Sequence, residues 1–399
     1  MIKIHLDDST TIKKNHLHHF KPIVLTKLYS KIIKAKQEKN YSLLWLLYYL
    51  HANVDKILTG ERKELKKIIA HIEKHYFISP SKLSKIKKER ESWIDGRHRK
   101  YGIEVVQTGL EIFIEKKSLY KHLDNKAPEL VGTFNDEVDN LKKKWKYYKD
   151  VLESIFDYDS FSRADEGWSA YELAERLNVT VCPYCNRMFT TLIKKAVGEE
   201  NQTRPDFDHY YLKSFYPYLG VSLYNLIPSC GVCNRSMKKT GDFYTSEAIY
   251  PYEEEFLKVA SFHTDLDYTD KKSYRYLLGE PVNFKVSFTI DETADKALQN
   301  QVKKAIKTFS LEGIYNNHKD IILDIIWISR LSTEDKFKEI YNVFGKMFES
   351  KEEFTERFFM NYMTPENQGR RPLAKLTQDI KEELRLSYKI RDEEAKKTK

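Results

Sequence analysis

The sequence predicts a mainly helical protein with a small α+β insert near its middle. Glycine and proline, which disfavour helices, are scarce, at 14 and 11 of 399 residues. Long stretches on both sides of the middle repeat apolar residues every three or four positions, as helices with one buried face do. All four cysteines fall within one short central stretch. We therefore expect a helical N-terminal domain over 1–165, a small module over 166–255 and a helical C-terminal domain over 256–399.

The N-terminal third is expected to be helical with two interruptions. Residues 21–79 carry the helical period, and Pro80 breaks it. The segment 103–117 is ambiguous between helix and strand, and the helical period returns over 137–156. The run 157–168 is polar and typical of turns, which places a domain boundary there.

The central module is expected to hold short strands around the cysteines. A helix over 169–178 leads into the first cysteine pair, and the β-prone segment RMFTTLI (187–193) follows that pair as a strand would. FDHYY (207–211) is predicted to be a second strand and SLYNLIP (222–228) a loop. Farther along, VNFKVSFTI (282–290) alternates in polarity and predicts a strand, and everything from about Ala294 onward is predicted to be helical.

The charge of the chain permits a nucleic-acid partner without requiring one. Lysine and arginine number 68 against 59 acidic residues, a net charge of +9. The basic residues gather at 82–100 and in LKKKWKYYK at 141–149, where lysines could neutralise phosphates and aromatic rings could stack on unpaired bases. The alternative is that both clusters are solvated helix faces with buried aromatics.

The sequence predicts a cytoplasmic protein without a membrane-spanning segment. Its longest apolar run, near Leu43 to Leu50, is too short to cross a bilayer, and the N-terminus lacks the apolar stretch of a secretory signal. In the cytoplasm thiols stay reduced and can bind metal.

The four cysteines predict a structural zinc site. They form two CxxC pairs, Cys182 with Cys185 and Cys230 with Cys233, and four thiolates are a ligand set that structural Zn²⁺ prefers. Four unrelated buried thiols would not be expected to fall into two such pairs.

An Asp-His dipeptide lies between the two pairs. A carboxylate suits a hard ion such as Mg²⁺, and an imidazole with an ordinary pKa can deprotonate water at neutral pH. Asp208 and His209 therefore predict a hydrolytic site that is separate from the zinc site. In isolation this dipeptide would be better explained as a surface pair. The remaining histidines, including His16, His18 and His19, show no ligand spacing.

The stretch CPYCNR, DHYYLKSFYP and SLYNLIPSCGVCNRSMKK, about 182–239, resembles the HNH endonucleases, which share the ββα-metal fold. The resemblance implies that His209 is the general base and that Asp208 ligates a catalytic Mg²⁺ or Mn²⁺. It also implies that Asn225 fixes the loop that orients the imidazole and that Asn234 is the second metal ligand. Such a site would cleave a phosphodiester to a 5′-phosphate and a 3′-hydroxyl.

The same resemblance places two lysines, Lys213 and Lys238, where they could meet phosphates. Leu212 departs from the family, in which many members carry proline at this place. In layout the stretch is most similar to nucleases of bacterial anti-phage systems such as the Septu type, which implies a role in defence and a partner ATPase. DNA is the expected substrate and RNA the alternative.

Two other function classes remain open. One is a non-catalytic nucleic-acid-binding protein whose knuckles form a zinc ribbon, and the other is a structural adaptor with a decayed nuclease site. A binder has no use for a histidine flanked by two potential metal ligands, and every catalytic position is filled, so the sequence favours the nuclease.

Overall fold

The computed structural model describes residues 2–6, 8–85, 88, 130–195, 201–239, 241–256, 259–267, 269, 273–278, 280, 283–331 and 334–384. It is mostly helical with two small β-sheets, as the sequence predicted. Most of the basic segment 82–100, and all of 103–117, lie outside the described residues. Within the described ranges, no helix combines the length and the apolarity that crossing a bilayer requires.

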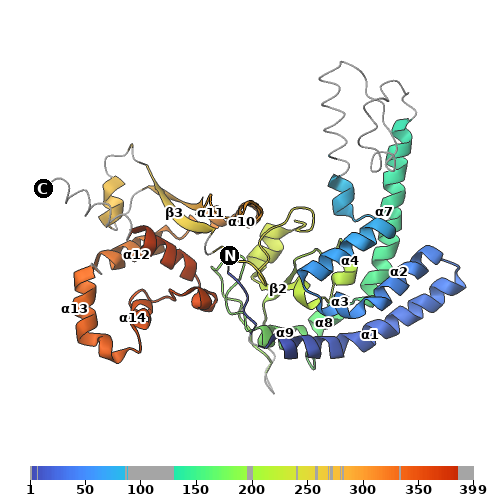
Figure 1. Cartoon of the computed structure of the whole chain (residues 1–399), viewed down its shortest axis with the longest axis horizontal. Helices are drawn as coiled ribbons and strands as arrows, with labels where there is room; N and C mark the ends of the chain where they lie inside the picture. Colours follow the sequence, from blue (N-terminus) through green and yellow to red (C-terminus); the bar gives the residue numbers. More distant parts are fainter. Residues whose placement is uncertain are drawn as a thin grey trace, which may run out of the picture.

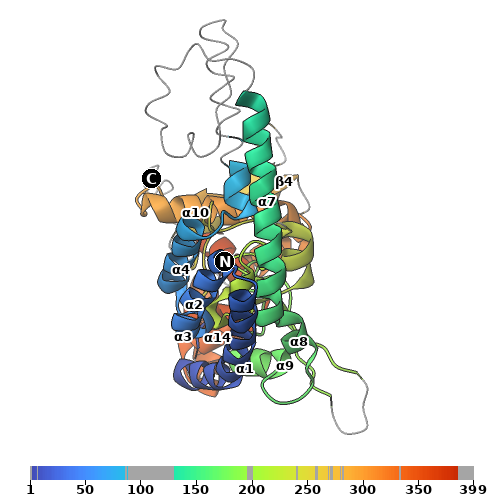
Figure 2. The same ribbon diagram turned by 90° about the vertical axis from the view of Figure 1, so that its right-hand side faces the viewer.

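The N-terminal helices form one side of the molecule (Figure 1). Figure 2 shows the long helix α7 running beside them. These helices are α1 (Ser9–Gln37), α2 (Tyr41–Ala52), α3 (Val54–Thr59), α4 (Arg62–His75) and α7 (Leu130–Ile155). Helix α1 begins where the Asp8 side chain accepts a hydrogen bond from the backbone N–H of Thr11, and it buries one side chain in about every four. The helical prediction for 21–79 is confirmed.

The predicted turn region 157–168 contains a short helix, α8 (Tyr158–Arg163). Asp157 caps it by accepting from the backbone N–H of Ser160 at 3.0 Å. A polar run with a capping residue can thus form a helical turn rather than an open loop. Helix α9 (Ala170–Leu177) follows, capped by Ser169, and confirms the helix predicted before the first cysteine pair.

The central sheet consists of two antiparallel strands, β1 (Asp206–His209) and β2 (Leu226–Ser229). The prediction of a strand at FDHYY is confirmed, and this strand ends at His209. The prediction of a loop over SLYNLIP is wrong: a 3₁₀ turn, η3 (Leu223–Asn225), leads into β2, whose four residues are all buried against β1. A second 3₁₀ turn, η2 (Pro217–Leu219), lies in the loop between the strands.

The strand predicted at RMFTTLI is not formed. Only isolated bridges occur there, between Val181 and Phe189 and between Ile193 and Thr203. The backbone at Asn186 has a φ of 49°, which turns the chain sharply after Cys185, and Phe189 is 60% exposed, so no buried face supports a continuous strand. After β2 comes a π-helical segment, η4 (Val232–Lys238), which carries the end of the second cysteine pair.

The C-terminal region combines a hairpin with helices on the opposite side of the molecule from α1–α4 (Figure 1). Strand β4 (Phe284–Ile290) confirms the strand predicted at 282–290, but its antiparallel partner β3 (Ala260–Leu266) was not predicted. The helical prediction from Ala294 onward is confirmed over the described residues, 294–331 and 334–384. The helices are α10 (Lys296–Thr308), α11 (Leu311–Tyr315), α12 (Lys319–Leu331), α13 (Glu334–Phe344) and α14 (Lys351–Phe358), with 3₁₀ turns η5 (Ser273–Leu278), η6 (Gly345–Met347) and η7 (Pro365–Arg370).

One contiguous cluster of buried apolar side chains runs from the N-terminal helices through the central sheet to the C-terminal helices. Polar contacts reinforce this packing. The buried guanidinium of Arg62, on α4, forms ion pairs with Glu247, Glu253 and Glu254. The central module is therefore held between its neighbours on both sides.

Candidate functional site

The four cysteines form a site that could hold a metal ion such as zinc. All are buried free thiols, and their sulfur atoms lie within 4.8 Å of one another. The sulfurs of Cys185 and Cys230 are 3.9 Å apart. A tetrahedral ZnS₄ site with Zn–S bonds of about 2.3 Å separates its sulfurs by about 3.8 Å, so the arrangement fits this ion. The positions of the four sulfurs therefore support the prediction that both knuckles share one structural ion.

The electrostatics of the cluster also favour a bound cation. Hydrogen bonding from the Cys182 thiol lowers the pKa of Cys185, whereas burial raises the pKa of Cys182. The four groups therefore cannot all be thiolates together unless a cation compensates their charge.

Alternation along β1 separates two chemical faces. Asp206 and Asp208, two positions apart, both point toward η4. Arg235 binds the Asp206 carboxylate with two hydrogen bonds of 2.6 and 2.7 Å, and Lys238 binds that of Asp208. The strand and the helix of the module are therefore joined by two ion pairs in addition to the cysteine cluster.

The Asp208 carboxylate is buried and fully occupied. Its oxygens accept from the Lys238 ammonium at 2.7 and 2.9 Å, and Oδ2 also accepts from the Tyr184 hydroxyl at 2.6 Å. The same ammonium donates to the backbone carbonyls of His209 (2.5 Å) and Tyr210 (3.1 Å). The Lys238 ammonium is itself a cation, and it is therefore already surrounded by four oxygens, two of them from Asp208.

This geometry changes the role predicted for Lys238. The lysine side chain is only 1% exposed, so its ammonium cannot contact a phosphate in this conformation. Burial lowers the pKa of Lys238, and the adjacent Asp208 carboxylate opposes that effect. The predicted phosphate contact is replaced by a buried ion pair.

On the other side of the strand, His209 is held in one tautomer. Its Nε2 lies 2.8 Å from the carbonyl oxygen of Gly220, and because a carbonyl only accepts, Nε2 carries the hydrogen. Nδ1 is then an unprotonated acceptor. Nδ1 bonds to no described residue, and it does not belong to the fully buried polar atoms that lack a hydrogen-bond partner, so it keeps some contact with solvent. Burial lowers the pKa of His209 to about 4, so the ring is neutral at pH 7.

Asn225 closes the loop that holds this histidine. Its Oδ1 accepts from the backbone N–H of Tyr211 at 2.7 Å, and its Nδ2 donates to the carbonyls of Tyr211 (3.0 Å) and Leu219 (3.1 Å). Leu219 immediately precedes Gly220, whose carbonyl orients the imidazole. The side chain therefore ties the end of β1 to the loop segment that sets the tautomer of His209.

The N-terminal helices hold the same loop segment from outside. His16 on α1 is fully buried, and its Nε2 lies 2.8 Å from the carbonyl oxygen of Val221. Its Nδ1 accepts from the indole N–H of Trp168 at 3.1 Å. Next along the chain, the Ser222 hydroxyl donates to the carbonyl of Ile57.

Asn234 lies on η4, directly after Cys233 and about one turn before Lys238. It is partly exposed, and its side-chain amide makes no hydrogen bond to any residue that the structure describes. Its carbonyl oxygen is therefore available as a ligand, unlike the carboxylate of Asp208.

Two further basic features behave differently. Lys213 is partly exposed, pairs with Asp159 at 2.8 Å and lies over the ring of Tyr158, which itself packs edge-on against His209. In the cluster at 141–149 four of the five lysines of α7 are exposed and Lys149 is partly buried, whereas Tyr148 is buried and Tyr147 is 44% exposed. Only one of these two tyrosines could stack on a base.

Sequence reasoning missed His16, Tyr158, Tyr184 and the carbonyl of Gly220. Tyr184 lies inside the first CxxC pair, so its place between the cysteines was visible, but its partner was not. His16 precedes the module by more than 150 positions and no spacing connects the two.

Comparisons with known proteins add no assignment: the chain matches no protein-family model, no curated protein and no solved structure.

Proposed function

We propose that the protein is a metal-dependent endonuclease of the HNH type that hydrolyses phosphodiester bonds, with DNA as the expected substrate. The observation that carries the proposal is the state of His209. It is neutral, its Nε2 is fixed by the Gly220 carbonyl, and its Nδ1 is left as an open acceptor. A general base needs an unprotonated nitrogen in a fixed orientation, and a pKa nearer the working pH than about 4 would make it more effective. Asn225, at the middle position of the motif, maintains it through three hydrogen bonds.

The residues present fit a hard divalent ion in their donor chemistry. Asp208 and Asn234 offer a carboxylate and an amide oxygen, ligand types that Mg²⁺ and Mn²⁺ accept. When bound, such an ion would offset the negative charge that develops on the scissile phosphate and the leaving oxygen. Asp208 would first have to release the Lys238 ammonium, which occupies the cation position in this structure.

Different residues of the chain would then have separate roles in the reaction. Nδ1 of His209 would accept the proton of the attacking water, while the Gly220 carbonyl stabilises the hydrogen that remains on Nε2. Lys213 lies over the ring of Tyr158, which is one of the ring contacts of His209. Once its ammonium leaves Asp159, it could neutralise a phosphate near the histidine. The cysteine cluster would hold η4 and β1 at a fixed separation.

The test compares wild type with His209→Ala on supercoiled and linear DNA in Mg²⁺ or Mn²⁺. We expect the wild type to nick DNA and leave 5′-phosphate ends, and we expect the variant to lose on the order of 10²-fold or more of the rate. Zinc content should stay unchanged, and the unfolding temperature should fall by only a few degrees, because the imidazole makes one hydrogen bond and one ring contact.

The zinc-ribbon binder remains the second candidate because Lys238 neutralises Asp208 in this structure. If the wild type binds DNA and RNA but cuts neither with any divalent ion, the binder replaces the nuclease. The resemblance to Septu-type nucleases also leads us to propose a role in defence with a partner ATPase. Cleavage that appears only when the ATPase is added would support that arrangement.

A further inference from the structure

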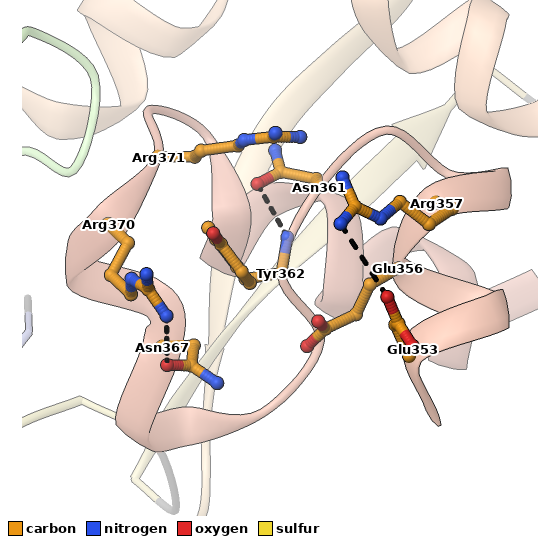
Figure 3. Close-up of a pocket in the computed structure, with 8 residues that line it drawn as sticks. All are labelled: Glu353, Glu356, Arg357, Asn361, Tyr362, Asn367, Arg370 and Arg371. Atoms are coloured by element: carbon orange, nitrogen blue, oxygen red, sulfur yellow. Dashed lines mark hydrogen bonds and ion pairs between the residues drawn. The ribbon is translucent and has the colours of Figure 1, made fainter. Parts of the chain in front are cut away.

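A polar pocket lies in the C-terminal region, outside the site described above (Figure 3). It has a volume of about 280 Å³ and lies between α14 and η7. Its lining consists of arginine, glutamate, asparagine and tyrosine side chains, without an aliphatic member. Such a lining suits a charged, hydrogen-bonding ligand rather than an apolar one.

Two arginines at the edge of this pocket keep most of their hydrogen-bonding capacity. The guanidinium carbons of Arg370 and Arg371 lie 4.9 and 5.2 Å from the ring centroid of Tyr362, which Figure 3 shows between them. Arg370 donates to the side chain of Asn367 at 3.4 Å, and Arg371 to the carbonyl of Met360 at 2.9 Å. Neither forms an ion pair within the described part of the chain, and a guanidinium carries five N–H donors.

The acidic side chains of the pocket already have partners. Glu353 pairs with Arg357 at 3.5 Å, and Glu356 accepts from the backbone N–H of Met363 at 3.0 Å. The backbone contact does not neutralise the Glu356 carboxylate, so the lining keeps a net charge of +1, from three arginines against two glutamates. The unpaired charge therefore favours an anion at this end of the pocket.

The segment that carries the two arginines is fastened to the first zinc knuckle. The Thr180 hydroxyl donates to the carbonyl of Gly369 at 3.0 Å, and Asn186 Nδ2 donates to that of Gln368 at 2.9 Å. The backbone N–H of Leu373 donates to the carbonyl of Asn186 at 2.6 Å. The arginines are thus held at a fixed place relative to the cysteine cluster and the strand–helix unit built on it.

We propose that this pocket binds a phosphate group of the nucleic-acid strand at a point away from the bond that is cut. Arginine recognises phosphate through paired N–H donors, and stacking on Tyr362 orders the guanidinium planes in advance. The identity of the ligand as a nucleic acid rests on the proposed function. The phosphate of a free nucleotide offers the same chemistry, and the experiment distinguishes these two sources.

The test measures binding of a fluorescent oligonucleotide by anisotropy over a range of salt concentrations. The full-length, zinc-loaded protein carries His209→Ala so that the probe stays intact. The test variant adds Arg370→Gln and Arg371→Gln. A matched control adds Lys303→Gln and Lys346→Gln, which remove the same charge from two exposed positions outside the pocket. We expect the arginine variant to bind roughly 10-fold more weakly near physiological salt, with a salt dependence shallower by about one to two phosphate contacts, and the control to change less than about twofold.

Several results would overturn the proposal. These are an unchanged affinity in the arginine variant, an equal loss in the lysine control, or no nucleic-acid binding by the parent protein. A nucleoside monophosphate that binds the parent but not the arginine variant, while both bind the oligonucleotide equally, would identify a free-nucleotide site instead. Because Arg371 also supports the carbonyl of Met360, Arg370→Gln alone serves as a second variant without that structural contact. Cleavage is assayed separately, so a chain that binds through the arginines but never cuts would refute the nuclease and leave the pocket standing.

Discussion

Each CxxC knuckle contributes two sulfur atoms to the cysteine cluster, but the two knuckles connect the cluster to different parts of the protein. The first knuckle is bound to the C-terminal region: Asn186 bonds to Gln368, Leu373 and Lys375, and the Tyr315 hydroxyl donates to the carbonyl of Cys185. The second knuckle leads into η4, whose basic residues bind the acidic face of β1. One knuckle therefore serves as an anchor, and the other, here called the chemical side, leads into residues of the proposed catalytic site.

This difference indicates how the module is kept in shape. Strands of four residues and a single helical segment bury little surface, so they need external support. The anchor fixes the cluster to the large C-terminal region, and the cluster fixes η4 against β1. Loss of the ion should disturb both knuckles, whereas loss of an individual contact should affect only one.

The largest effect is expected from Cys230→Ser, which removes one of the four sulfurs. A structural zinc site contributes on the order of 10 kcal/mol to the folded state. We expect the variant to lose its zinc, measured by elemental analysis, and to lose cooperative unfolding of the module. Cys182→Ser should behave alike, since both knuckles share the ion. A variant that kept full stability without metal would show that the cluster is a packing feature only.

The next largest effect is expected from Lys238→Met on the chemical side. It leaves the buried carboxylate of Asp208 without its cation, which costs about 3–5 kcal/mol of folding free energy. A divalent ion can then replace the ammonium, so Mn²⁺ should raise the unfolding temperature of this variant more than that of the wild type. The double variant Lys238→Met with Asp208→Asn is the control, and it should lose the response to Mn²⁺. An identical response in all three proteins would rule out Asp208 as a ligand.

The site residues were predictable from sequence to the extent that they lie in one ordered motif. Spacing alone predicted that the four cysteines lie together, and composition predicted the strand that carries Asp208 and His209. The contacts that decide their state were not predictable, because they come from elsewhere in the chain. Local spacing carries no information on Lys238 as the partner of Asp208 or on His16 as a support of the histidine loop.

The errors in the predicted fold have the same origin. RMFTTLI has the composition of a strand but lacks a partner, because the turn at Asn186 leads it to the surface. LIPS contains proline and resembles a loop, yet pairing with β1 and complete burial make it a strand. The sequence of β3 did not predict a strand, and only its antiparallel pairing with β4 identifies it as one. Pairing between segments overrides local preference in each case.

A third prediction concerns the N-terminal support of the histidine loop. Burial lowers the pKa of His16 from its ordinary value of 6.5 to about 4, so the folded state holds this ring neutral. The stabilisation is complete above the unfolded pKa and is lost as the pH falls from 6.5 toward 4, because the unfolded chain takes up the proton first. Between pH 7 and pH 5, the wild type should lose about 2 kcal/mol more free energy of unfolding than His16→Gln.

The comparison with His16→Gln isolates this residue because His209, whose pKa is also lowered by burial, is present in both proteins. Denaturant unfolding at several pH values provides the measurement. Parallel pH profiles of the two proteins would mean that His16 has the same pKa in the folded and the unfolded chain, so that the fold accepts the protonated ring.

The smallest effect on the Asp208 side of the module is expected from changes at the anchor. Asn186→Ala removes two side-chain hydrogen bonds, to Gln368 and Lys375, and places alanine at a φ of 49°. We expect a loss of about 2–3 kcal/mol of folding free energy from the bonds and the backbone strain together. Asn186→Gly loses the same bonds but adopts this backbone readily, so it should cost about 1 kcal/mol less. When each is combined with Lys238→Met, both variants should retain zinc and the response of Asp208 to Mn²⁺, because the second knuckle is untouched. If either one abolishes that response as Asp208→Asn does, the two knuckles act as a single unit and their separation into anchor and chemical side fails.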